Sequence, residues 1–340
     1  MVFFMQCGFA MLCAGSVRQK NVKNILFKNL LDACGGAIGF WTLGYAFSYG
    51  DGPFYIGLSN FALMDMSDGA DYAFFFFQFA FAATAATIVA GTVAERCKMV
   101  AYLCYSLMLT GFVYPIVVRS IWSSSGWLSK FNEELFMGVG MIDFAGSGVV
   151  HMTGGATALV AAIVLGARKG RFRDEDGNPL PEPHSFPPHS VGLQMLGTFI
   201  LWFGWYGFNP GSALAITPAG YGDVAALSAV TTTISAASGV VSAVFTNTLI
   251  DYIKTGNIEY DLSMAMNGGL GGLVGITANC CVVTPYYACA IGAAAGWVYL
   301  IFSNLLVAFR IDDAVDAIPV HLGCGIWGCI VSVSLIQFLL

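Results

Sequence analysis

The chain has 340 residues, of which 57% are hydrophobic and only 10% are charged, and its net charge is −6. A soluble domain carries about 25% charged residues, so this composition excludes a soluble protein and indicates an integral protein of the lipid bilayer. The acidic balance, without a basic cluster interleaved with aromatic residues, also excludes nucleic acid as a partner.

Ten apolar runs separated by polar breaks predict ten transmembrane helices. In chain order they cover residues 1–16, 29–49, 72–93, 99–119, 144–167, 190–210, 224–249, 263–283, 286–308 and 317–340. A spanning helix needs about 20 residues and a barrel strand only about 10, so helices are predicted. The first run is shorter than a full span, and we expect a helix whose beginning is missing.

The basic residues sort by alternate loops. Of the 14 lysines and arginines, all except Arg119 and Lys130 fall at one side of the predicted bundle. The positive-inside rule makes that side cytoplasmic and places the N-terminus outside. The loops of the other side carry acidic residues, from Asp51 to Asp71 and at Glu133, which would attract cations modestly.

Two histidines lie inside apolar runs, in the similar contexts VHMTGG at His151 and VHLGCG at His321. An ionisable side chain within a membrane span is usually functional. The two lie in the fifth and tenth runs, and a duplicated half of five helices would insert upside down. The pattern predicts one domain, residues 1–340, as an inverted repeat around a central pore. The halves are residues 1–167 and 190–340, joined by a cytoplasmic linker at 168–189. The predicted depths of the two histidines are compatible with contact, although separate hydrogen bonds to neighbouring helices remain the simpler alternative.

Several strings carry a family resemblance over nearly the whole chain. The run DFAGSGVVHMTGG at residues 143–155 is the strongest, supported by CAGSVR at 13–18, AERC at 94–97, GWYGFNPGSA at 204–213 and HLGCGIWG at 321–328. Together they resemble the ammonium transporters of the Amt/Mep/Rh family, closest to the plant-like Amt branch. That family has an eleventh helix and a cytoplasmic tail, so we expect both to be missing from this sequence.

The resemblance implies a transporter of ammonium or ammonia rather than an enzyme, with methylammonium as an analogue and with no cofactor. It also implies a homotrimer, with a pore in each subunit, in the plasma membrane. No cysteine pair has zinc-ligand spacing with histidines, so no metal site is expected.

The resemblance places Trp122, Phe81 and Ser212 at an outer vestibule. Aromatic faces attract a cation, and the Ser212 hydroxyl would accept one of its N–H groups. Phe77 and Phe81 stand four residues apart on one helix face and resemble the family's stacked phenylalanine gate. A membrane-interface role for Trp122 and a lipid-facing role for the phenylalanine run remain alternatives.

Asp143 stands at the outer start of the fifth segment, where it would attract the cation, accept its proton or cap the helix. We expect His151 and His321 to line the pore as mainly neutral rings, because burial disfavours charge. Each neutral ring has one donor and one acceptor nitrogen, so two rings in contact would form a proton relay. Trp205 and Thr277 also match pore positions of the family.

Three competing functions remain at this point. An ammonium sensor or transceptor would share the whole site. An Rh-type channel for ammonia or carbon dioxide generally lacks the tryptophan seen here as Trp122. An intramembrane hydrolase would use Ser147, Asp143 and His151, but the G-x-S-x-G turn of such enzymes is absent from the sequence.

Overall fold

The computed structural model describes the backbone of residues 1–339 and the side chains of residues 1–334, and this part of the chain is all helical apart from its loops. Among these residues, five helices are long and apolar enough to cross a membrane. The prediction of an all-α polytopic membrane protein is confirmed.

The described residues form ten continuous helices. The α-helices are α1 (Met5–Ser16), α2 (Val22–Gly39), α3 (Tyr45–Tyr49), α4 (Gly69–Thr92), α5 (Met99–Met108), α6 (Tyr114–Trp122), α7 (Thr153–Leu165), α8 (Val191–Phe208), α9 (Tyr221–Thr255), α10 (Leu262–Ile276), α11 (Pro285–Ala308) and α12 (Cys324–Leu339). Two π-helical turns, at 40–44 and 109–113, join α2 to α3 and α5 to α6.

Three predicted segments have wrong bounds. The segment predicted at 29–49 begins at Val22, because Lys28 is buried in the helix and donates from Nζ to the Cys97 carbonyl at 2.7 Å. The segment at 224–249 continues to Thr255. The segment at 263–283 ends at Ile276, because the carbonyls of the next two residues accept from the backbone of 144–145 instead.

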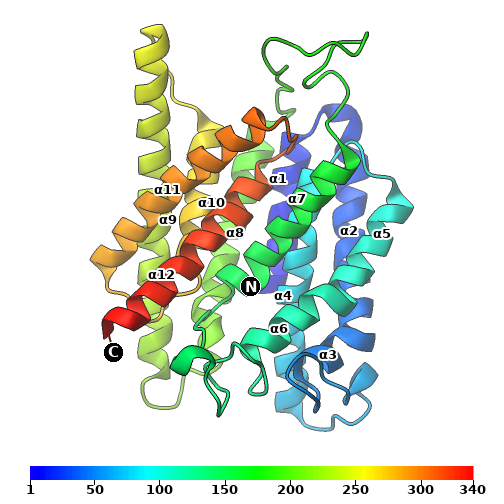
Figure 1. Ribbon diagram of the computed structural model, residues 1–340, viewed down its shortest axis with the longest axis vertical. Helices are drawn as coiled ribbons and strands as arrows, with labels where there is room; N and C mark the ends of the chain where they lie inside the picture. Colours follow the sequence, from blue (N-terminus) through cyan, green and yellow to red (C-terminus); the bar gives the residue numbers. More distant parts are fainter. Residues whose placement is uncertain (340) are drawn as a thin grey trace.

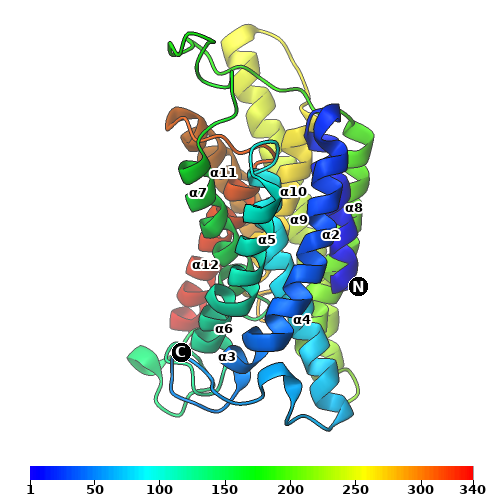
Figure 2. The same cartoon turned by 90° about the vertical axis from the view of Figure 1, so that its right-hand side faces the viewer.

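The loops lie at two opposite ends of the bundle (Figures 1 and 2). One end carries the turns at 17–21, 93–98 and 309–317 together with the long loop at 166–190, and these contain most of the basic residues. The loops at 50–68 and 123–146 lie at the other end. The charge asymmetry read along the sequence is therefore an asymmetry of the folded molecule.

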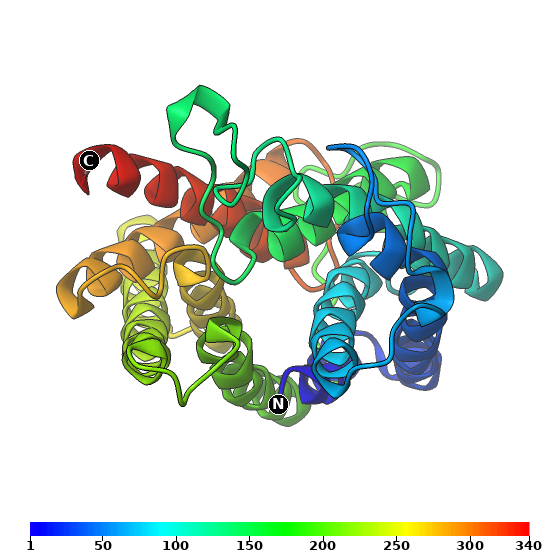
Figure 3. The same cartoon turned by 90° about the horizontal axis from the view of Figure 1, so that it is seen from below.

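Seen from the end that carries the loops at 50–68 and 123–146, α2 to α6 gather on one side and α9 to α11 on the other (Figure 3). Helix α1 packs against α8, α7 packs against the π-helical turn at 318–323, and α12 packs against the π-helical turn at 147–152. Gly155 of α7 allows the first of these turns to come close, because a Cβ at that position would lie 2.4 Å from the Leu322 nitrogen.

Both histidine strings begin with a π-helical turn, Ser147–Met152 before α7 and Ile318–Gly323 before α12. Such turns widen a helix locally and often mark functional sites. The two turns contact each other and contain His151 and His321, and the site lies at this contact.

Candidate functional site

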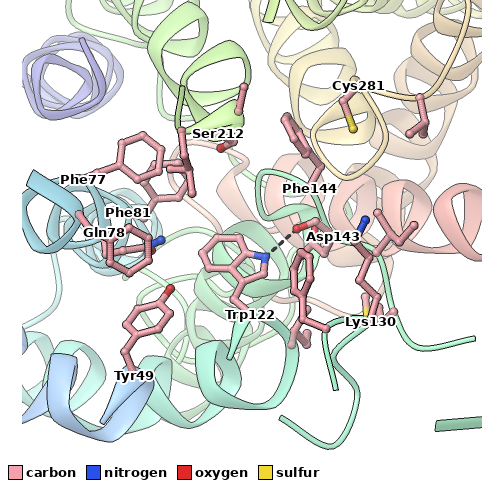
Figure 4. A pocket seen from close by; sticks show the side chains of 18 of the residues that line it. Tyr49, Phe77, Gln78, Phe81, Trp122, Lys130, Asp143, Phe144, Ser212 and Cys281 are labelled. Carbon is pink, nitrogen blue, oxygen red and sulfur yellow. Dashed lines mark hydrogen bonds between the residues drawn. The ribbon is translucent and has the colours of Figure 1, made fainter. Parts of the chain in front are cut away.

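A cavity of about 380 Å³ opens at the end of the bundle that carries the acidic loops (Figure 4). Its walls include all the side chains predicted for the vestibule and its gate, which are Phe77, Phe81, Trp122, Asp143 and Ser212. They come from α4, α6, the loop before α7 and the turn after α8. The fold therefore brings these distant residues to one apolar, half-open chamber.

Trp122 forms one wall of this chamber. Its Nε1 donates to the backbone carbonyl of Asp143 at 2.7 Å, and its ring meets Phe81 edge-on with centroids 5.9 Å apart. The indole is thus fixed by protein contacts, and its ring lines the cavity. Two aromatic surfaces at one site are a suitable environment for a cation.

Ser212 presents an acceptor to the same chamber. Its hydroxyl donates to the carbonyl of Phe208 at 2.8 Å. A hydroxyl has one proton and two lone pairs, so this bond leaves the oxygen free to accept from an N–H group in the cavity.

The Asp143 carboxylate accepts hydrogen bonds from backbone N–H groups of the residues that follow it. Oδ1 accepts from Gly146 N at 3.1 Å, and Oδ2 accepts from Gly148 N at 2.9 Å and Val149 N at 2.8 Å. The residue is only 3% exposed. Of the three predicted roles, capping is the one that these contacts match, since unpaired N–H groups at a helix start need acceptors.

The stacked phenylalanine pair differs from the prediction. Phe77 and Phe81 are neighbours with centroids 4.6 Å apart, but their planes are tilted by 45°. Phe81 instead stacks on Phe208, at 4.0 Å and 21°. The reason is that residues four apart on one helix lie side by side along it, whereas a ring from α8 can face Phe81 across the space between helices. Phe208 lies within the string GWYGFNPGSA at 204–213, but no spacing in that string distinguishes it from the neighbouring residues.

The two histidines are in contact at the centre of the molecule. Their Nδ1 atoms are 3.1 Å apart, and the rings lie nearly parallel at 20°. Both side chains are buried. Such a contact requires one nitrogen to donate and the other to accept. The ring centroid of His151 also lies 5.4 Å from that of Phe208, and its Nε2 has no hydrogen-bond partner among the described residues.

Trp205 and Thr277 support His151. The Trp205 indole stacks on the His151 ring at 5.1 Å and 16°, and its Nε1 donates to Thr277 Oγ1 at 3.0 Å. That hydroxyl donates to the Leu273 carbonyl at 2.7 Å. Their polar atoms are therefore engaged with each other, so the contact with His151 is made by the indole ring.

Two further cavities continue toward the other end. A small one of about 20 Å³ lies beside His321, with Phe9 and Thr87 in its wall. A wider one of about 240 Å³ opens among the basic loops. Asn267 and Asp316 line both. A series of cavities and aromatic contacts thus leads from the chamber at the acidic loops past the histidine pair to the end that carries the basic loops.

Asp313 is a residue that the sequence reasoning missed. Its Oδ2 accepts from Ile318 N at 2.7 Å and its Oδ1 from Val315 N at 3.2 Å, at the start of the π-helical turn that carries His321. Asp143 stands in the same relation to its own turn. Each aspartate precedes its histidine by the same number of residues, 143 to 151 and 313 to 321, and this equal spacing was the available signal.

The hydrolase alternative conflicts with the geometry of Ser147. Its hydroxyl donates to the Val274 carbonyl at 2.7 Å and accepts from Ala278 N at 2.8 Å. The serine thus connects the turn before α7 to α10 and the segment after it, while the His151 Nδ1 faces His321. Among the residues that the structure describes, no group of three or more potential metal ligands was found.

Comparison with known proteins gives concordant results. The sequence profile of the Ammonium Transporter Family matches residues 1–339. Ammonium transporter 1 member 3 of Solanum lycopersicum is 45% identical, over 97% of this chain and 71% of its own length. Ammonium transporter 1 member 2 of Arabidopsis thaliana is 46% identical, over 94% of this chain and 63% of its own length. The chain thus spans about two thirds of the length of these relatives.

Solved structures show the same fold. A protein described as a sensor Amt protein superposes with a TM-score of 0.84 at 35% identity, covering 97% of this chain and 78% of its own. The crystal structure of Saccharomyces cerevisiae Mep2 gives a TM-score of 0.82 at 27% identity, covering 97% and 71%. The profile match along the chain and these relatives show that the chain belongs to the Ammonium Transporter Family.

Proposed function

We propose that the protein transports ammonium by binding the cation in the outer chamber, removing a proton, and passing ammonia along the apolar passage, while the histidine pair relays the proton. One observation carries the proposal: the two histidine rings are in contact between an outer and an inner cavity, with Nδ1 atoms 3.1 Å apart. Membership of the Ammonium Transporter Family supports ammonium as the substrate.

The outer chamber suits ammonium better than potassium. The faces of Trp122 and Phe81 contribute about 0.5–2 kcal/mol of cation–π attraction, which any small cation would receive. The free lone pairs of Ser212 add a directed hydrogen bond. Ammonium has four N–H donors and potassium has none, so this acceptor discriminates between them.

The apolar lining of the passage favours loss of a proton from ammonium before it enters. Beyond the chamber, Phe81 and Phe208 stack at 4.0 Å and both are fully buried. Moving a bare charge into such surroundings costs tens of kcal/mol in an idealised apolar medium. Neutral ammonia avoids most of that cost, and the proton takes the separate path that the two imidazole rings provide.

The surroundings of the pore are part of the proposal. The basic loops face the cytoplasm and the acidic loops face outward, by the positive-inside rule, so the chain begins outside in a plasma membrane. The halves 1–167 and 190–340 are inverted copies, which the matching π-helical turns and aspartate caps support. Three copies assemble, each with its own pore.

The test is ammonium-evoked current across a bilayer that contains the protein, with methylammonium and potassium as comparison ions. We expect His151→Leu and His321→Leu each to abolish or strongly reduce ammonium current. His184→Leu, in the exposed loop before α8, is the matched control and leaves it unchanged. Unchanged current and selectivity in both pore variants would refute the relay.

Sensing is the second candidate, because one similar solved structure is described as a sensor Amt protein. A sensor needs the outer chamber but not a conducting pore. Ammonium binding without current in the wild-type protein would favour sensing, and current that scales with ammonium concentration would favour transport.

A further inference from the structure

The outer chamber contains a basic side chain that the proposed mechanism has not used. Among the described residues that line the chamber, Lys130 is the only lysine, arginine or histidine. Figure 4 shows Lys130 on the Asp143 side of Trp122, with Phe77 and Phe81 on the opposite side. Like charges repel, so this lysine opposes the binding of a cation that the aromatic walls favour.

Lys130 differs from Arg119, the other basic residue at this end of the bundle. Arg119 is 1% exposed, and its guanidinium donates to the carbonyls of Gly50 at 2.6 Å and Gly52 at 2.8 Å. Lys130 is exposed, and its ammonium group has no carboxylate within 4.0 Å in the part of the chain that the structure describes. Arg119 thus holds a loop in place, whereas the charge of Lys130 is available to act on a cation in the chamber.

The backbone of Lys130 is fixed at the edge of the chamber. The carbonyl of Leu128 accepts from Met141 N at 2.7 Å. Gly140, whose φ is +64°, lies so close that a Cβ there would be 2.6 Å from the Lys130 Cα. These contacts fix where the side chain starts, while its four-carbon stem stays flexible. Its Nζ lies 5.2 Å from the ring centroid of Phe131, which also lines the chamber.

The size of the chamber sets the strength of the repulsion. A cavity of about 380 Å³ keeps a bound cation within roughly 8 Å of a charge on its wall, and at that separation Coulomb's law changes the affinity about twofold at the dielectric constant of water and about 30-fold at an effective value of about 20. The Debye length at physiological ionic strength is also about 8 Å. The repulsion should therefore be measurable in dilute salt and weaken as salt is added.

Such a repulsion suits a conducting site. Conduction requires binding strong enough for an ion to enter and weak enough for it to leave. The faces of Trp122 and Phe81 and the oxygen of Ser212 attract ammonium, and Lys130 limits how tightly it is held. Charge repulsion acts equally on every monovalent cation, so Lys130 lowers the affinity for ammonium and methylammonium by the same factor.

We propose that Lys130 is an affinity-determining residue of the outer chamber, an inference that rests on the proposed function. Its positive charge weakens the binding of ammonium in the chamber and thereby favours release of the substrate into the pore. Lys130→Met keeps an unbranched apolar stem and removes the charge, whereas Lys130→Arg keeps the charge. The two variants therefore separate the charge of this side chain from its bulk.

The test is ammonium current as a function of ammonium concentration, in balanced salt of about 0.01 M and about 1 M, where the Debye length is about 30 Å and about 3 Å. In dilute salt, Lys130→Met should lower the half-saturating ammonium concentration about 2- to 30-fold, and methylammonium should show the same factor. In concentrated salt the difference from wild type should nearly vanish. Lys130→Arg should behave as the wild type in both salts.

Glu133→Gln is the matched control, because it changes the charge of the same exposed loop by one unit at a residue that does not line the chamber. It should leave the half-saturating concentration unchanged. An unchanged value in Lys130→Met, an equally large shift in Glu133→Gln, or a shift that is the same in both salts would overturn the role of the Lys130 charge. A shift in Lys130→Arg equal to that in Lys130→Met would do so too.

Calorimetric titration of the purified proteins with ammonium chloride measures the affinity of the chamber without transport. Tighter binding in Lys130→Met than in the wild type would support the inference even if the wild-type protein carried no ammonium current, a result that would overturn only the proposed function. Equal dissociation constants for the two proteins in dilute salt would overturn the inference and leave the proposed transport untouched.

Discussion

Replacing Asp143 with alanine removes the acceptor of three buried backbone N–H groups, those of Gly146, Gly148 and Val149. A buried donor without a partner costs about 1–3 kcal/mol, so the protein should lose about 3 kcal/mol or more of stability. Asp143→Asn keeps one carbonyl oxygen and can retain the one bond of Oδ1 or the two of Oδ2. We expect it to lose about half as much.

The assay is thermal unfolding of the purified protein, followed by ammonium current on the same preparations. Asp261→Ala is the matched control, because that exposed aspartate caps α10 through Ser263 N at 2.7 Å and Met264 N at 3.3 Å. Loss of an ordinary cap costs about 0.5–2 kcal/mol. If Asp143→Ala melted at the wild-type temperature yet carried no current, the carboxylate would act on the cation and the capping argument would fail.

Two further predictions concern the gate and the inner loops. Phe208→Leu removes the ring stacked on Phe81, so we expect potassium current in this variant and none in Phe77→Leu; equal potassium currents in the two would contradict the gate. Arg168→Gln removes a guanidinium that donates twice to buried Asp312 at 2.8 Å. Arg96 and Arg171 remain beside the carboxylate, and a hydrogen bond to a charged group contributes about 1.5–3 kcal/mol, so we expect a loss of about 2–3 kcal/mol in thermal unfolding. Burial acts to raise the pKa of Asp312, but hydrogen bonds and charge from Arg168 and the charge of Arg96 outweigh it, and the net pKa lies below its usual value. This stabilisation is present above the unfolded-state pKa and lost as pH falls through the folded-state pKa, so the wild-type melting temperature should drop in acid and that of Arg168→Gln should drop less. An equal fall of the melting temperature in acid for both proteins would show that the Arg168–Asp312 ion pair does not contribute to stability.

The comparison of Phe77 with Phe208 shows the limit of local spacing. Residues four apart on a helix share a face, and Phe77 and Phe81 are indeed neighbours. The spacing says nothing about which ring from another helix covers that face. Phe208 comes from α8 in the other half of the chain, so its contact with Phe81 depends on how the helices pack.

Asp143 and Ser147 illustrate the same limit for polar groups. A carboxylate before a helix is compatible with capping, with cation attraction and with proton transfer, and the sequence left all three open. The choice among them depends on where its lone pairs point, and that follows from the path of the backbone between 143 and 149. The partners of Ser147 lie in α10 and the turn after it, beyond the reach of any pattern around the serine itself.

The sequence by itself determined the membrane class, the number and order of the helices, the sorting of charge between the two ends and the importance of the two histidines. These depend on hydrophobic runs and on the cost of burying charge, which are properties of single segments. The tertiary structure decided that the histidines meet, that Phe208 is the stacking partner of Phe81, that Asp143 and Asp313 cap equivalent turns, and that Asp316 lies at the inner end of the passage. Each of these depends on contacts that the packing of helices creates, and the spacing of residues along one helix does not contain that information.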